Sequence, residues 1–290
     1  MRADNTRMNI ATTAPSALPR FWADLKSPDF ARLDLARCIA VLPVAATEQH
    51  GPHLPLNVDT TLVDGVVAAT LTHLPANLPL LFLPTQGIGF SPEHTRFAGT
   101  LTLKAETVIR LWTELAESVA ATGVKKLVLL NAHGGNVGLL DVVARDLRTR
   151  LGMLVYSVNS FNLPLRDDNG ASVADRFSAH EHRFGIHAGE IETSMMLALK
   201  PDQVDMAKAQ DFHSASQDRS ERFSILGDGR SAKLGWQMQD YNPHGAVGNA
   251  AAATAEKGQA LLGAMGRSLA QLLAEIDQLP ADTLRSTTAY

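Results

Sequence analysis

Short apolar runs alternate with longer amphipathic stretches along this chain of 290 residues. The runs are rich in Val, Ile or Leu and end at Pro, Asn or Gly, as buried strands do. Strands are expected at Cys38–Ala45, Leu80–Pro84, Lys126–Asn131 and Met153–Val158. The amphipathic stretches carry apolar residues at helical spacing. Helices are expected at Thr60–Leu74, Lys104–Thr122, Val137–Leu151, Gly189–Leu199 and Ala250–Leu279. This alternation is typical of an α/β fold with a mainly parallel sheet.

Two long segments, Phe161–Ile186 and Asp211–Val247, follow neither pattern. Long irregular segments in compact domains are often lids or binding loops, and plain surface excursions are the alternative. No shift in composition marks a domain boundary. We therefore expect one domain over residues 21–280, with a loose leader over residues 1–20 and a polar tail over residues 281–290.

Composition narrows the possible partners and compartment. Hydrophobic residues make up 45% of the chain and charged residues 19%, with a formal net charge of −4. This charge argues against a nucleic-acid surface, which needs a basic patch. No stretch reaches the ~18–20 uncharged apolar residues of a membrane span, and the N-terminus lacks the apolar core of a signal peptide. The single cysteine, Cys38, cannot form an internal disulfide. We therefore expect a cytoplasmic protein that binds neither nucleic acid nor membrane.

Metal-ligand side chains follow the first expected strand. Glu48 and His50 are two residues apart in extended chain, so their side chains point to the same side. Gly51 and Pro52 then turn the chain, and Asp59 comes just before the next expected helix. Carboxylate and imidazole groups at the carboxyl end of a strand are suitable ligands for Zn²⁺ or Mn²⁺. A hydrogen-bonded polar turn, with Asp59 as a helix cap, is the alternative interpretation.

A second candidate group begins at His133, directly after the expected strand Lys126–Asn131. Gly134 and Gly135 let backbone approach a ligand closely, and the following helix start offers N–H groups to an oxyanion. A tight turn with a solvated histidine is the alternative interpretation.

A third group lies at the start of the expected helix Gly189–Leu199, where His187, Glu190 and Glu192 fall within six residues. The helix dipole favours acidic residues in a first turn. Two carboxylates and a histidine nevertheless exceed what capping requires. A carboxylate here can complete a metal pair, and His187 or Glu190 can move protons.

Together these groups resemble the creatininase family in three motifs that follow the family's order. The motifs are Glu48-x-His50-Gly51 with Asp59, Asn131-x-His133-Gly134-Gly135-Asn136, and His187-Ala188-Gly189-Glu190-x-Glu192-Thr193-Ser194. Two weaker blocks agree, namely Gly89–His94 with Phe97–Thr100, and Gly245–Ala250 with Ala255–Gly258. The resemblance covers about residues 38–263.

The resemblance implies a single three-layer α/β domain, with helices flanking the sheet, in a ring-like homohexamer. It also implies two divalent metal ions per subunit, Zn²⁺ and/or Mn²⁺, with Fe²⁺ as a further option. By the same resemblance, Glu48 and His133 would hold one ion, His50 would hold the other, and Asp59 would bridge both. The remaining expected site residues are His187 and Glu190 for catalysis, and Ser91, His94, Gly134 and Gly135 for substrate binding.

Two positions depart from the family pattern. Gly135 stands where creatininase proper has the carboxylate of the second metal ion, so Glu192 is our first candidate for that ligand and Glu190 the second. Asn249 stands where the family commonly has an acidic residue. Both departures argue against creatinine as the substrate, but neither argues against a hydrolase.

We therefore expect a metal-dependent amidohydrolase that cleaves a C–N bond of a small cyclic amide or formamide-type substrate. A hydroxide held between the two ions would attack the carbonyl carbon, and His187 would protonate the leaving nitrogen. Backbone N–H groups near Gly134 and Gly135 would stabilise the oxyanion. A metallopeptidase that trims a short peptide in cofactor maturation is the alternative enzyme, and a non-catalytic metal or ligand binder is the third hypothesis.

Overall fold

The computed structural model describes residues 19–289, so most of the expected leader lies outside the described residues. Four parallel strands form the central sheet in the order β2-β1-β3-β4. They are β1 (Ile39–Val44), β2 (Leu80–Phe82), β3 (Lys126–Asn131) and β4 (Leu154–Asn159). The four predicted strands are confirmed. Strand β2 ends at Phe82, short of Pro84, which has no N–H to donate to a ladder.

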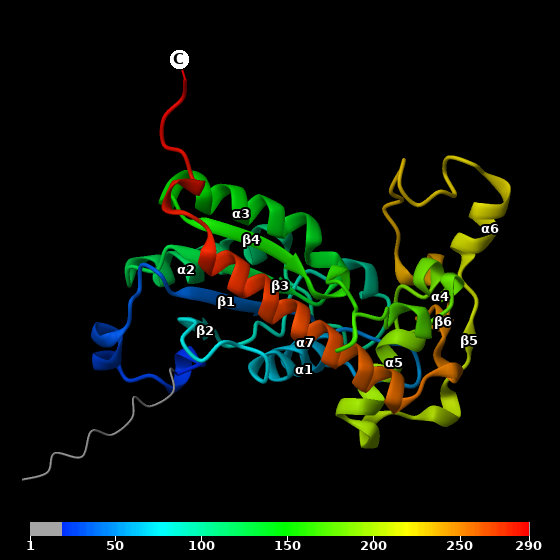
Figure 1. Cartoon of the computed structure of the whole chain (residues 1–290). Coiled ribbons are helices and arrows are strands. Elements are labelled where there is room, and N and C mark those ends of the chain that lie inside the picture. The colour runs from blue at the N-terminus through cyan, green and yellow to red at the C-terminus, as the bar shows by residue number, and fades with distance from the viewer. Residues whose placement is uncertain (1–18, 290) are drawn as a thin grey trace, which may run out of the picture.

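Helices cover both faces of the sheet, and this confirms the predicted three-layer α/β fold. On one face lie α1 (Val58–Leu71), α5 (Glu190–Leu199) and α7 (Ala255–Gln278), and on the other lie α2 (Ala105–Ala121) and α3 (Val137–Leu151) (Figure 1). Side chains of β1 alternate between the two cores, Ile39 with the first and Ala40 with the second. The side chain of Trp112 is fully buried in the second core. Each large apolar side chain buried in this way contributes roughly 1.5–3 kcal/mol.

Two helices begin at positions that differ from the prediction. Helix α1 begins at Val58, so Asp59 lies inside its first turn rather than before it. Helix α7 begins at Ala255, where the Thr254 hydroxyl accepts a hydrogen bond from the Lys257 N–H at 3.2 Å. Residues Ala250–Ala252 form a 3₁₀ turn instead of the start of this helix. The capping bond favours a helix start after Thr254, because the hydroxyl satisfies an N–H that has no partner within the helix.

The two segments expected to be irregular each contain a short helix, so that prediction was wrong in part. Helix α4 (Ala179–Phe184) lies in the first, and α6 (Ala215–Arg222) lies in the second. In addition, β5 (Asp211–Phe212) pairs antiparallel with β6 (Gly248–Asn249). These elements gather beyond the carboxyl ends of the sheet strands, and the chain around α6 projects outward (Figure 1). Helix α6 has no apolar periodicity, which is why its sequence did not reveal it.

Among the helices of residues 19–289, none combines the length and apolar character that a bilayer crossing requires.

Candidate metal and catalytic site

The first site side chains meet at the carboxyl ends of two neighbouring strands. Strands β1 and β3 pair in register up to Val44 and Asn131. Glu48 and His50 follow β1, and His133 follows β3, so the topology brings them to one edge of the sheet. Asp59 reaches the same place from the first turn of α1.

Four side chains form a compact buried cluster, which we call the ligand cluster: Glu48, His50, Asp59 and His133. Nδ1 of His133 lies 3.3 Å from Glu48 Oε1 and 3.3 Å from Asp59 Oδ2. The other Asp59 oxygen, Oδ1, lies 3.5 Å from Nε2 of His50. Asp59 therefore stands between the two histidines and faces each with a different oxygen.

Both histidines of the ligand cluster turn an unprotonated nitrogen inward when they are neutral. Nδ1 of His50 lies 3.0 Å from the Glu48 carbonyl, which can only accept, so the proton sits on Nδ1. Nε2 of His133 lies 3.0 Å from the Phe90 carbonyl, so its proton sits on Nε2. The lone pairs of His50 Nε2 and His133 Nδ1 are then free to bind a cation.

Three buried polar atoms of the ligand cluster lack a hydrogen-bond partner within residues 19–289. They are Glu48 Oε2, His50 Nε2 and Asp59 Oδ2. Leaving a buried polar atom unpaired costs about 1–3 kcal/mol, and more for a charged group. Divalent cations would satisfy all three atoms, because carboxylate oxygens and imidazole nitrogens are their usual ligands. The residues present therefore fit the metal ions that the sequence motifs imply.

The structure separates the two glutamates of the third motif. Oε2 of Glu192 lies 3.8 Å from His50 Nε2 and accepts the Ala188 N–H at 2.6 Å. Ala188 holds a left-handed backbone conformation, with φ of 53°, to present that N–H. Glu190 instead forms an ion pair with Lys257. Glu192 thus lies beside the ligand cluster, whereas Glu190 does not.

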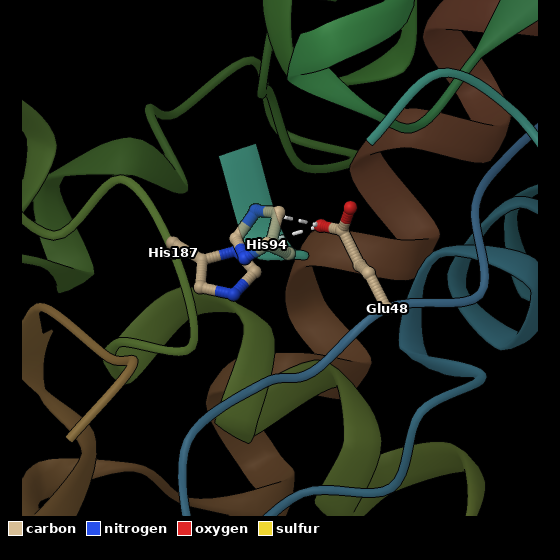
Figure 2. Close-up of side chains that lie close together, drawn as sticks. All are labelled: Glu48, His94 and His187. Carbon is tan, nitrogen blue, oxygen red and sulfur yellow. Dashed lines mark ion pairs between the residues drawn. The ribbon is translucent and has the colours of Figure 1, made fainter. Parts of the chain in front are cut away.

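His94 and His187 lie beside the ligand cluster, with their rings 4.3 Å apart (Figure 2), and the His187 ring lies 4.2 Å from that of His50. Glu48 Oε1 is 3.3 Å from His94 Nε2 and 3.8 Å from His187 Nδ1. Gln49 fixes both rings. Its Oε1 accepts the Gly51 N–H, which orients the amide so that its Nε2 donates to His94 Nδ1 at 2.8 Å. The Gln49 carbonyl lies 2.8 Å from His187 Nε2, which therefore carries the ring proton.

Burial and charge split the histidines into two groups. Burial disfavours the charged form of His50, but Asp59 and the nearby glutamates outweigh it and raise the pKa to about 9. Glu48 and Asp59 likewise overcome burial and raise the pKa of His133 well above its usual value. For His94, burial lowers the pKa to about 4, and for His187 burial and the neighbouring histidines lower the pKa well below the usual value. His94 and His187 are therefore neutral near pH 7.

The carboxyl groups show the same competition. Burial alone would raise the pKa of Asp59, but its contacts with His133 and His50 lower it. For Glu192, burial dominates and raises the pKa to about 7. A cation bound beside Glu192 would favour its charged form.

The remaining predicted residues lie around His133. Ser91 is fully buried, and its Oγ lies 3.2 Å from His133 Nε2, on the side of the ring away from the ligand cluster. At Gly134 no atom of the described residues lies within 4 Å of where a Cβ would stand, whereas Gly135 is crowded there. The sequence reasoning gave no role to Gln49 or Glu93. Gln49 lies within the Glu48-x-His50 motif and Glu93 within the Gly89–His94 block, and these positions were the only indication of a role that the sequence offered.

The segment around α6 contributes one aromatic side chain next to the site. The half-buried Trp236 presents an edge to His94, with ring centroids 6.3 Å apart, and packs on Tyr241 at 4.9 Å. Part of the expected lid segment therefore lies against the histidines of the site.

The fold and this group of carboxylates and imidazoles define an α/β protein with a candidate metal site, and comparison with known proteins identifies the family. The creatininase family, described as creatinine amidohydrolase, matches residues 23–273, so this chain belongs to the creatininase family of hydrolases.

The relatives carry names that point to different substrates. The mycofactocin precursor peptide peptidase of Mycobacterium ulcerans (strain Agy99) is 32% identical over 200 residues, which cover 67% of this chain and 66% of that protein. The protein of the same name from Mycobacterium tuberculosis (strain ATCC 25618 / H37Rv) is 35% identical over 170 residues, 57% of this chain and 59% of that protein. The chain thus spans up to about two thirds of the length of these peptidases. The creatinine amidohydrolase of Pseudomonas putida is 30% identical over 196 residues, 64% of this chain and 74% of that protein.

Solved creatininase structures share the fold over most of both chains. The Mn form of creatininase has a TM-score of 0.70 at 26% identity and covers 89% of this chain and 99% of that chain. A mutant creatininase of Zn–Zn type has a TM-score of 0.70 at 25% identity, with 89% and 98% covered.

Proposed function

We propose that this protein hydrolyses an amide C–N bond with the help of two divalent metal ions. The observation that carries the proposal is the ligand cluster, in which three buried ligand atoms have no hydrogen-bond partner among residues 19–289 and a nitrogen of each of the two imidazoles faces the Asp59 carboxylate. A polar cluster with a purely structural role would pair these atoms internally.

The contacts divide the ligands between two positions. Glu48 and His133 would hold one ion, since Oε1 and Nδ1 lie 3.3 Å apart. His50 and Glu192 would hold the other, and Asp59 would contact both through its two oxygens. Glu192 thus takes the place of the carboxylate that Gly135 lacks. Ions bound here would polarise a carbonyl and lower the pKa of a bound water from 15.7 toward about 7.

His187 carries the proton transfer in this proposal. It is neutral with its proton on Nε2, so its Nδ1 faces Glu48 as a base. It therefore enters the reaction by accepting a proton from the attacking water, and it donates to the leaving nitrogen only afterwards. The sequence-based expectation of a proton donor is refined to an acceptor that then donates. Gln49 keeps the ring in the tautomer that this role requires.

The relatives reorder the candidate substrates. Peptide-bond hydrolysis now comes first, since the peptidases of two mycobacterial species align with the chain at 32% and 35% identity. A small cyclic amide or formamide comes second, and is supported by the creatinine amidohydrolase of Pseudomonas putida. Both substrates present a carbonyl carbon and a leaving nitrogen, so the same residues can act on either.

A turnover panel tests the proposal. The protein is stripped with a chelator, reloaded with Zn²⁺ or Mn²⁺, and offered short peptides, creatinine, cyclic imides and formamides. We expect metal-dependent hydrolysis of at least one class. In Asp59→Asn the loss of kcat/KM should exceed the roughly 10–100-fold that is typical for a group that only supports a ligand.

Asp64→Asn is the matched control, because Asp64 is exposed on the same helix. It should keep full activity and metal content. Full activity of Asp59→Asn, or equal activity with and without metal, would contradict the proposal.

A further inference from the structure

The outer nitrogen of the His133 ring is enclosed by one short segment of chain. Nε2 of His133 lies 3.0 Å from the Phe90 carbonyl, 3.2 Å from Ser91 Oγ and 3.6 Å from Glu93 Oε1. The inner nitrogen, Nδ1, faces Glu48 and Asp59. Hydrogen-bond acceptors therefore face both ring nitrogens of His133. In the neutral ring the single proton is on Nε2, the nitrogen that faces Phe90 and Glu93.

Gly135 makes room for this arrangement. A Cβ at position 135 would lie 2.5 Å from Glu93 Oε1 and would also collide with the Phe90 carbonyl and with His133 Nε2 itself. The backbone of Gly135 is not in the left-handed region, so space rather than conformation requires a glycine. The neighbouring Gly134 has open space at the same place. Only Gly135 therefore lets the segment reach the ring.

The segment is anchored on both sides, so its approach to His133 is a built feature. The Phe90 N–H donates to Asn136 Oδ1 at 3.0 Å, and the Ser91 N–H donates to Thr102 Oγ1 at 2.8 Å. The Glu93 side chain is largely buried, with 12% exposed. Throughout the described part of the chain, His133 is the one basic side chain that Glu93 faces within ion-pair distance.

We propose that Glu93 is a positioning residue for His133: the Phe90 carbonyl accepts the Nε2 proton, and the negative charge of the Glu93 carboxylate, 3.6 Å away, favours the proton on that nitrogen, so that Nδ1 is presented to a metal ion. The inference rests on the proposed function, because it assumes that His133 is a ligand. A carboxylate behind a ligating histidine fixes the tautomer and raises the basicity of the ring, and losing it typically costs 10–100-fold in metal affinity. Gly135, which departs from the creatininase pattern, is then the position that admits this carboxylate.

Glu93→Gln tests the inference, since it keeps the shape of the side chain and removes its charge. Zn²⁺ affinity is measured by competition with a chelating indicator, and the Nε2–H proton and ¹⁵N shifts of His133 are measured by NMR. We expect affinity to fall about 10–100-fold and the Nε2–H resonance to move upfield, because the negative charge that polarises this N–H is removed. Glu106→Gln, at an exposed residue in the first turn of α2, should change neither quantity.

Glycine variants give a second measurement. Gly135→Ala should lower Zn²⁺ affinity more than Glu93→Gln, because its Cβ would displace the Phe90–Glu93 segment and would also collide with His133 Nε2. Gly134→Ala should leave the affinity close to wild type, because its Cβ meets no described atom within 4 Å. Wild-type affinity and an unchanged Nε2–H resonance in Glu93→Gln would overturn the inference. If the wild-type protein binds no Zn²⁺, the proposed function is wrong. The role of Glu93 is then tested by NMR of the metal-free protein alone, and an Nε2–H resonance that is the same in wild type and Glu93→Gln would contradict it.

Discussion

The stability of the metal-free protein should fall as the pH rises, because of the protonated His50. Its folded-state pKa of about 9 lies above the ordinary value of 6.5. A histidine whose pKa is raised on folding contributes stability that is fully present below the unfolded pKa and is lost as the pH rises through the folded pKa. The stabilising contact is with Asp59, whose Oδ1 lies 3.5 Å from Nε2.

The size of the effect follows from the two pKa values. Each unit of difference is worth about 1.4 kcal/mol. Between pH 7.5 and pH 9 most of the His50 contribution disappears, so the free energy of unfolding should fall by about 1.5 kcal/mol. His133 changes in the same direction, because its pKa is also raised.

Urea unfolding of chelator-treated protein at these two pH values measures the fall, with His50→Gln as the reference. Cys38 also titrates in this window, since burial raises the pKa of its thiol to about 12 and only the unfolded chain ionises. That contribution is common to both proteins and cancels in their difference. A wild-type protein that loses no more stability than His50→Gln would refute the assignment of a protonated His50 beside Asp59.

Two further predictions concern the third motif and the packing of α5 on α7. Glu192→Gln should reduce the bound metal, measured by plasma emission, from two ions to one per chain, because Glu192 lies beside His50. Glu190→Gln should keep both ions, because Glu190 pairs with Lys257. The opposite result would reverse our choice of ligand. Gly258→Ala should lower the free energy of unfolding by about 1–3 kcal/mol, because its Cβ would collide with the Ser194 carbonyl. Gly263→Ala, in an open part of the same helix, should be neutral or stabilising by up to about 1 kcal/mol, and equal costs for the two variants would contradict this packing.

Much of the fold could be predicted because it depends on local patterns. The run Ile39–Val44 is apolar throughout and so is the centre of Lys126–Asn131, as in strands that are buried on both faces. The topology then places the residues after β1 and β3 at one edge, which is why Glu48 and His133 could be expected to meet. Helix α6 could not be predicted in the same way, because it has no buried residues to produce a periodic pattern.

The detailed roles within the site depend on contacts that no local pattern encodes. Glu190 and Glu192 are the same residue type two positions apart, and contacts with distant residues separate them: Glu190 pairs with Lys257, whereas Glu192 lies beside His50. Gly135 looked like a missing ligand, yet its significance comes from the loop that carries Glu93. Such relations between distant segments require the three-dimensional structure.

The central claim is that Glu48, His50, Asp59 and His133 hold a pair of cations. Crystals of the protein grown with Mn²⁺ and measured at the manganese absorption edge test it most directly. We expect two anomalous peaks, one between Glu48 and His133 and one beside His50, with Asp59 in contact with both. No peak within coordinating distance of Asp59 in Mn²⁺-saturated crystals would contradict it.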